Sequence, residues 1–245
     1  MTVDPDLTSL QAILFDLDGT LVETDNRWAQ VLAAKLQPVT RVLPGADVDA
    51  LSRQLVMALE TPTNYVMSIL EHLGLGSSFF GLADRVRRSK GLATRRGSRL
   101  IEGTGALLEA LAGRYKLAVV TTRARPEAEA FVRQIGGACH FSAVITREDV
   151  WGIKPNPAPV LKAAARLGVA AERCALVGDT TMDVVAARRA GAVAIGVLSG
   201  FAHRRELERA GAQLVLGRAE EILAHLPPIA RPPPGQDSLD PERKG

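Results

Sequence analysis

The sequence predicts an α/β protein whose core is a doubly wound parallel sheet, with a small α-helical domain inserted after the first strand. After about residue 99, short apolar runs typical of buried strands alternate with helical segments. This alternation indicates right-handed βαβ crossovers in a buried sheet. Between residues 24 and 95 no strand-like run occurs, and apolar residues recur every three or four positions, as in amphipathic helices.

The expected strands are short apolar runs bounded by turn residues. The first, 12–15, ends in a turn that contains acids and a glycine, and the others are 116–122, 141–149, 174–179, 192–200 and 213–217. The intervening helices are expected at 104–114, 126–137, 156–169, 181–191, 206–211 and 219–226. Pro126 suits a first helical turn, and Gly191 suits a helix end.

The domain division follows from these patterns. We expect a core formed by 11–23 plus 96–226, a helical insert at 24–95, and flexible termini at 1–10 and 227–245, the latter rich in proline. Proline and glycine residues divide the insert into three or four short helices.

The composition excludes several classes of protein. Of the 245 residues 47% are hydrophobic and 23% charged, which is enough to form a full core. No membrane span or signal peptide is expected from the apolar runs or the N-terminal residues. Cys139 and Cys174 fit neither a disulfide framework nor a metal spacing, which indicates free thiols in the cytoplasm. The net charge of +3 is spread along the chain, so no nucleic-acid partner is expected.

Polar side chains follow four of the expected strands. Because ligands bind beyond the carboxyl ends of parallel strands, these residues are expected at one edge of the sheet. They are Asp16, Asp18, Gly19 and Thr20 after the first strand, Thr121, Thr122 and Arg123 after the second, Lys154 after the third, and Asp179 and Asp183 after the fourth.

This set of residues indicates phosphoryl transfer. Asp16, Asp18 and Asp179 would repel one another unless a divalent cation lay between them, and Mg²⁺ prefers such oxygen ligands. Lys154 supplies a positive charge and Thr121 a donor for a phosphate oxygen. One aspartate can act as the nucleophile that forms an acyl phosphate, while the other serves as acid and base.

Four short segments carry a resemblance to a known family. DLDGT at 16–20, VVTT at 119–122, GIKPNP at 152–157 and GDTTMD at 178–183 resemble the four motifs of the haloacid dehalogenase superfamily. The resemblance covers about residues 11–226. It implies a Rossmann-like core, and it makes the insert similar to the C1-type cap of phosphoglycolate phosphatase and its relatives.

The resemblance also implies a role for each residue. Asp16 would be the nucleophile, and Asp18 the general acid and base and a metal ligand through its backbone carbonyl. Lys154 would steady Asp16, and Asp179 would bind the metal, with Asp183 as a direct or indirect partner of the ion. Thr20 would order the loop, and the phosphate would meet Gly19, Thr20, Thr121, Thr122 and Arg123.

The implied activity is Mg²⁺-dependent hydrolysis of small phosphorylated metabolites, phosphoglycolate-like or sugar phosphates, by a cytoplasmic enzyme. Asp18 favours phosphate esters, since members that cleave carbon–halogen bonds lack an acid there. A phosphomutase of β-phosphoglucomutase type and a non-catalytic binding module remain as alternatives. Monomer and homodimer are both open. Individually, Asp179 could be a helix N-cap, and Asp183 and Lys154 could be surface charges.

Overall fold

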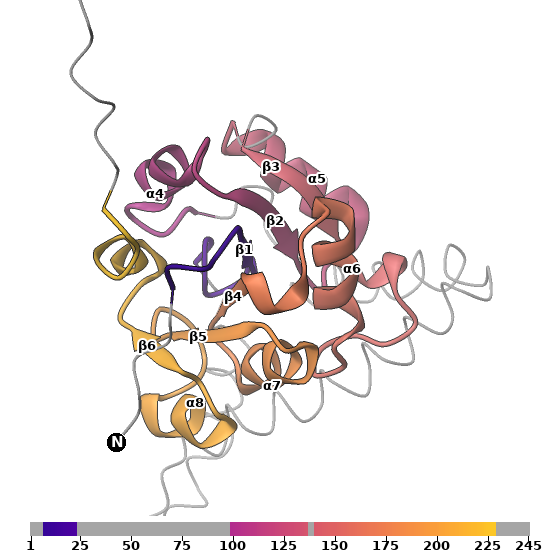
Figure 1. Ribbon diagram of the computed structural model, residues 1–245. Helices are drawn as coiled ribbons and strands as arrows, with labels where there is room; N and C mark the ends of the chain where they lie inside the picture. The colour runs from indigo at the N-terminus through magenta and orange to yellow at the C-terminus, as the bar shows by residue number, and fades with distance from the viewer. Residues whose placement is uncertain (1–6, 24–98, 137–139, 229–245) are drawn as a thin grey trace, which may run out of the picture.

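The sheet has the predicted parallel, doubly wound topology. The computed structural model describes residues 7–23, 99–136 and 140–228. Six strands, all paired in parallel, follow the order β3-β2-β1-β4-β5-β6 (Figure 1). Their bounds are β1 Ala12–Phe15, β2 Lys116–Val120, β3 Phe141–Ile145, β4 Cys174–Gly178, β5 Val193–Val197 and β6 Leu214–Leu216. The chain reverses its direction of winding between β1 and β4, where open α/β sheets bind ligands.

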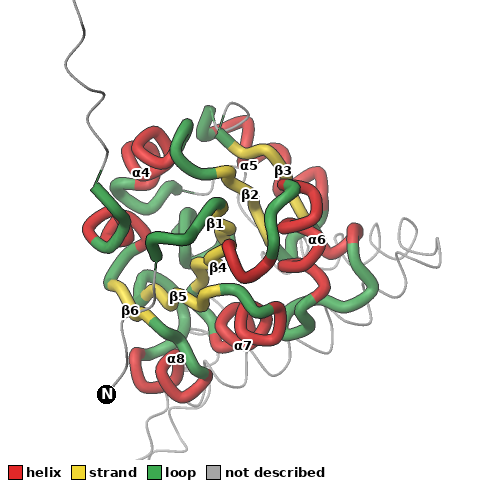
Figure 2. Tube along the Cα trace, viewed as in Figure 1, coloured by secondary structure: helices red, strands yellow, loops and turns green. Residues whose placement is uncertain are grey.

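Helices alternate with the strands, as Figure 2 shows. The α-helices are α4 Thr104–Leu111, α5 Arg125–Gln134, α6 Ala158–Leu167, α7 Thr181–Ala190 and α8 Arg204–Ala210. Short 3₁₀ helices are η3 Arg147–Asp149, η4 Ala171–Arg173 and η5 Ala219–Ala224. The last expected helix is present as a 3₁₀ helix. One expectation was wrong in detail: the strand expected to reach 149 ends at Ile145 and is followed by η3.

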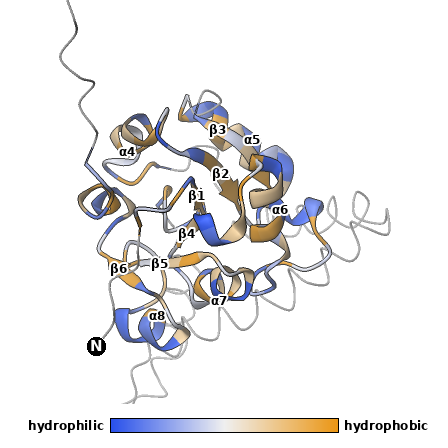
Figure 3. Cartoon of the chain, viewed as in Figure 1, coloured by the Kyte–Doolittle hydropathy of each residue, from blue (hydrophilic) through white to orange (hydrophobic). Residues whose placement is uncertain are grey.

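The two faces of the sheet pack against different helices because side chains alternate along each strand. Ile13 and Phe15 point to the side covered by α4, α5 and η5. Ala12 and Leu14 point to the side covered by α6, α7 and α8, where many of the buried residues are alanines. The central strands are accordingly hydrophobic, whereas polar residues lie on the outer helices (Figure 3).

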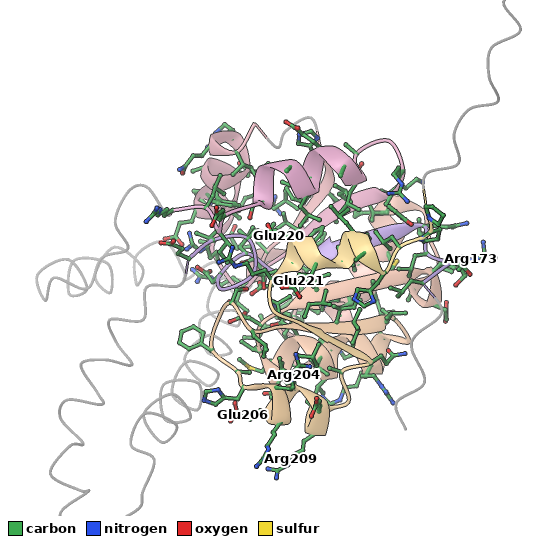
Figure 4. All side chains as sticks on the ribbon, turned by 90° about the vertical axis from the view of Figure 1, so that its left-hand side faces the viewer. Arg173, Arg204, Glu206, Arg209, Glu220 and Glu221 are labelled. Carbon is green, nitrogen blue, oxygen red and sulfur yellow. The ribbon has the colours of Figure 1, made fainter. Side chains whose placement is uncertain are left out.

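The surface formed by α8 and η5 mixes charges of both signs. Figure 4 shows Arg204, Glu206 and Arg209 on α8 and Glu220 and Glu221 on η5. This face of the described chain therefore carries no stripe of basic residues alone. Among the described helices, none has the length and apolar character needed to cross a membrane.

Several predictions concern residues that the structure does not describe. The helical insert at 24–95 and Cys139 lie outside the described residues. Of the segment expected to be a flexible N-terminus, residues 7–10 are described, and Leu7 and Leu10 are buried in the core. Cys174 is a buried free thiol, as expected.

Candidate active site

Three buried carboxylates meet at the carboxyl edge of the sheet. Asp16 follows β1 and Asp179 follows the adjacent β4, and the Asp16 N–H donates to the Val177 carbonyl at 2.9 Å, which keeps the two strand ends level. Asp183 lies in the first turn of α7. One carboxylate oxygen from each of Asp16, Asp179 and Asp183 lies within 4.8 Å of the others. The three residues are between 0% and 7% exposed.

Two glycines shape the space around Asp179. Gly19 has a φ of 72°, a left-handed conformation that favours glycine. A Cβ atom at Gly19 or at Gly200 would overlap the carboxylate of Asp179. The loop that contains Gly19 is closed by backbone hydrogen bonds, including Gly19 N–H to Val22 carbonyl at 2.8 Å, and Ser199 Oγ donates to the Gly19 carbonyl at 2.6 Å.

Asp179 has one oxygen satisfied and one oxygen available. The Phe201 N–H donates to Oδ2 at 2.8 Å, whereas Oδ1 is buried and has no hydrogen-bond partner among the described residues. Burial, reinforced by the charges of Asp16 and Asp183, raises the pKa of Asp179 well above its usual range. An unpaired buried carboxylate is costly unless a cation compensates it. The donor set, all oxygens, therefore fits a hard divalent cation such as Mg²⁺.

Lys154 neutralises part of this charge from the side of β2. Its Nζ donates to Asp16 Oδ1 at 2.9 Å, to the Val120 carbonyl at 3.1 Å and to Asp183 Oδ1, which uses all three ammonium donors. Burial lowers the pKa of Lys154, but Asp16 and Asp183 more than offset this and raise it on balance. Lys154 is therefore a buried cation, and its interpretation as a surface charge was wrong.

Desolvation also acts on Asp16. Burial is the largest influence and raises the pKa of Asp16 to about 7, although Lys154 opposes it. Both Asp16 and Asp179 thus hold protons more tightly than free carboxyls when no cation is bound.

Asp183 is fixed by the start of α7. Thr180 is the N-cap, its hydroxyl accepts from the Asp183 N–H at 3.3 Å, and Asp183 Oδ2 accepts from the Thr180 N–H at 3.1 Å in a reciprocal capping box. The interpretation of Asp179 as the cap was therefore wrong, as was that of Asp183 as a surface acid. The box leaves Asp183 Oδ1 facing Lys154.

Asp18 lies apart from the cluster of carboxylates. Its side chain is 35% exposed and forms a bidentate ion pair with Arg123, so Asp183 takes the place that we expected Asp18 to occupy beside Asp16 and Asp179. An Asp18 side chain that faces away remains compatible with the prediction that its backbone carbonyl binds the metal.

The remaining predicted residues lie around the edge of the site. Thr121 is buried and its Oγ1 accepts from the Arg123 N–H at 3.2 Å, while Thr122 is partly exposed. The Thr20 hydroxyl is buried without a hydrogen-bond partner among the described residues, so backbone hydrogen bonds order this loop instead.

The sequence reasoning missed the loop after β5. Ser199, Gly200 and Phe201 contact Gly19 and Asp179. A signal was available, because β5 is a parallel strand and its carboxyl end must lie at the same edge as those of β1 and β4.

The fold and site together define an α/β protein with a cluster of carboxylates that can bind a cation, placed where the sheet reverses its winding. The family model described as haloacid dehalogenase-like hydrolase matches residues 13–197. The chain belongs to this family.

Relatives of known name agree with this class. The chain is 29% identical over 230 residues to a phosphoglycolate phosphatase of Pectobacterium atrosepticum, which covers 89% of this chain and 93% of that protein. It is 29% identical over 196 residues to the pyrophosphatase PpaX of Bacillus velezensis, covering 76% and 82%. The first of these relatives supports the predicted class, a phosphoric monoester hydrolase of the family.

Solved structures share the fold. A crystal structure of a predicted phosphoglycolate phosphatase from Haemophilus somnus is similar with a TM-score of 0.59 and 25% identity, and covers 89% of this chain and 98% of that one. A Thermotoga maritima structure named for β-phosphoglucomutase gives a TM-score of 0.60 at 24% identity, over 88% and 98% of the two chains. The fold alone therefore does not separate hydrolase from mutase.

Proposed function

We propose that this protein is a Mg²⁺-dependent phosphatase that hydrolyses phosphate monoesters of small metabolites through an aspartyl-phosphate on Asp16. The observation that carries the proposal is the buried cluster of Asp16, Asp179 and Asp183. Lys154 pairs with Asp16 and Asp183, while Asp179 Oδ1 has no hydrogen-bond partner within the described part of the chain. We also propose a cytoplasmic location.

Asp16, Asp179 and the backbone carbonyl of Asp18 would hold the ion, with Asp183 acting directly or through Lys154. When bound, Mg²⁺ neutralises negative charge on the carboxylates and on the phosphoryl oxygens.

Asp16 acts as the nucleophile. Lys154 fixes Asp16 Oδ1 at 2.9 Å, which orients the carboxylate and stabilises the negative charge that develops around phosphorus. Attack of Asp16 on phosphorus forms the acyl phosphate and breaks the bond from phosphorus to the leaving oxygen.

Asp18 acts as the general acid and the general base. It donates a proton to the leaving oxygen in the first transfer and accepts one from the attacking water in the second. Thr121 orients the phosphoryl oxygens, whereas the Gly19 and Thr20 N–H groups already donate within the turn to the Val22 and Leu17 carbonyls. The segment 24–95 acts as a lid that excludes water during the first transfer.

Phosphoglycolate-like esters and sugar phosphates are the proposed substrates. The similarity to proteins named as phosphoglycolate phosphatases favours the former. The experiment that tests the proposal is a phosphate-release screen of phosphorylated metabolites, run with Mg²⁺ and with EDTA. Mg²⁺-dependent release of inorganic phosphate in step with ester loss is the expected result.

Two other outcomes would refute the hydrolase. Formation of an isomeric phosphate ester without free phosphate would identify a mutase, which would use the same Asp16. No turnover of any ester in the presence of Mg²⁺ would favour a non-catalytic binding module.

A further inference from the structure

Arg123 and Asp18 form an ion pair at the outer edge of the site. Arg123 Nε donates to Asp18 Oδ2 at 2.7 Å, and Nη2 donates to Oδ1 at 2.5 Å. The Arg123 side chain is only 15% exposed, compared with 35% for Asp18. A guanidinium buried in this way is already largely desolvated. Its planar arrangement of N–H donors matches the oxygens of a carboxylate or phosphate.

The two cations of the site have separate positions. Lys154 is fully engaged inside, with Asp16, Asp183 and the Val120 carbonyl. Arg123 follows β2, and its backbone is tied to Thr121 at 3.2 Å, so its side chain reaches across to the loop after β1. The guanidinium has five N–H donors, of which Asp18 takes two.

The position of Asp18 locates the leaving portion of the substrate relative to Arg123. A proton donor must come within about 2.6–3.2 Å of the leaving oxygen. Arg123 is hydrogen-bonded to the same Asp18 carboxyl group, so it lies one hydrogen-bond length beyond that group as seen from the leaving oxygen. The leaving oxygen therefore comes within about 6 Å of the guanidinium. An anionic group two or three bonds beyond that oxygen would be within reach of Arg123.

We propose that Arg123 determines specificity by recognising a second anionic group, a carboxylate or a further phosphate, in the leaving portion of the substrate. On binding, that group takes the guanidinium N–H donors that Asp18 leaves open, while Asp18 stays within reach of both Arg123 and the leaving oxygen. The inference rests on the proposed function, because it takes Asp18 as the proton donor. It narrows the substrates to phosphate monoesters whose leaving group is itself negatively charged.

Equilibrium binding tests this inference without requiring turnover. The probes are 3-phosphonopropionate and propylphosphonate, which differ in the terminal carboxylate and cannot be hydrolysed as esters. Calorimetry with Mg²⁺ should show that the wild type binds the carboxylated phosphonate more tightly by about tenfold or more, in line with a bidentate charged contact. Arg123→Gln should abolish this preference, and Arg123→Lys should restore part of it.

Arg125→Gln is the matched control. Arg125 is two residues away and pairs with Glu129 and Asp149 rather than with Asp18. The Arg125→Gln variant should keep the wild-type preference for the carboxylated phosphonate. In kinetics, Arg123→Gln should raise KM for phosphoglycolate much more than KM for ethyl phosphate, with a smaller change in kcat.

Three results would overturn the inference: equal binding of the two phosphonates by the wild type, a preference that survives in Arg123→Gln, or no binding of either phosphonate. If Arg123 were only a structural tie, its loss would weaken binding of both phosphonates equally and leave the preference intact. An Arg123-dependent preference in a protein that releases phosphate from no ester would uphold this inference and refute the proposed function.

Discussion

Asp179 is buried between two residues that have no side chain. Gly19 and Gly200 approach its carboxylate so closely that a methyl group at either position would displace it. The N–H of Phe201 holds the other side at 2.8 Å, so the carboxylate has little room to move. At the scale of the residue, the glycines thus position a ligand for the cation.

Gly200→Ala tests this arrangement. The added Cβ should push the Asp179 carboxylate out of line with Asp16 and raise the Mg²⁺ concentration for half-maximal phosphate release by about tenfold or more, as expected when a metal ligand loses its support. Gly105→Ala is the control, because nothing lies within 4 Å of a Cβ there. An unchanged Mg²⁺ requirement in Gly200→Ala would show that Asp179 does not set the affinity for the ion.

The sequence could reveal the residue types of the site but not their pairing. Asp16 and Asp179 were predicted together because their strands end at one edge, and they do meet. Asp18 was expected with them, but the chain bends at Leu17 and turns at Gly19, and the Asp18 side chain pairs with Arg123 instead. The capping box that holds Asp183 at the site depends on Thr180 being the N-cap of α7, and the sequence pattern did not define that position.

The first turn of α7 links the stability of an element to the site. Thr180 caps the helix, and its hydroxyl and N–H bind the carboxylate of Asp183, which in turn contacts Lys154. The cap therefore orders the carboxylate cluster as well as the helix.

Thr180→Ala should lower the free energy of unfolding by about 1 kcal/mol, the usual cost of losing a side-chain cap. Urea denaturation followed by circular dichroism measures this change. Thr180→Ser retains the hydroxyl and should remain close to the wild type. Equal stability of Thr180→Ala and the wild type would mean that the capping box does not contribute.

Elements with strong periodicity were the easiest to predict. All six strands were foreseen, because β-branched and aliphatic runs separated by helical segments have few other interpretations. The helix expected at 219–226 is present, but it is a six-residue 3₁₀ helix, because the segment lacks the length that stabilises an α-helix. Burial of Leu7 and Leu10 was equally hidden, because two isolated leucines form no pattern.

For the molecule as a whole, stability and cation binding should be coupled through pH. The pKa of Asp16 is raised from 3.8 to about 7 in the folded protein, chiefly by burial and against the pull of Lys154. Such a group binds its proton more tightly when folded. Its contribution to the free energy of unfolding is therefore complete below pH 3.8 and is lost as the pH rises toward about 7.

A cation that binds the deprotonated carboxylates should offset this loss. We expect Mg²⁺ to raise Tm more at pH 8 than at pH 5, as measured by differential scanning calorimetry with and without the ion. Asp179→Asn should lose most of the shift at pH 8. A shift of equal size at both pH values would contradict the assignment of these carboxylates as the cation ligands.

The central claim is that Asp16 attacks phosphorus, and covalent labelling during turnover tests it most directly. Wild-type protein mixed with a ³²P-labelled phosphate ester and Mg²⁺, then quenched in acid, should carry the label on the peptide that contains Asp16. Asp16→Asn should fold like the wild type by circular dichroism, take up no label and lose turnover by about a thousandfold or more. Near-normal phosphate release by Asp16→Asn would contradict the account.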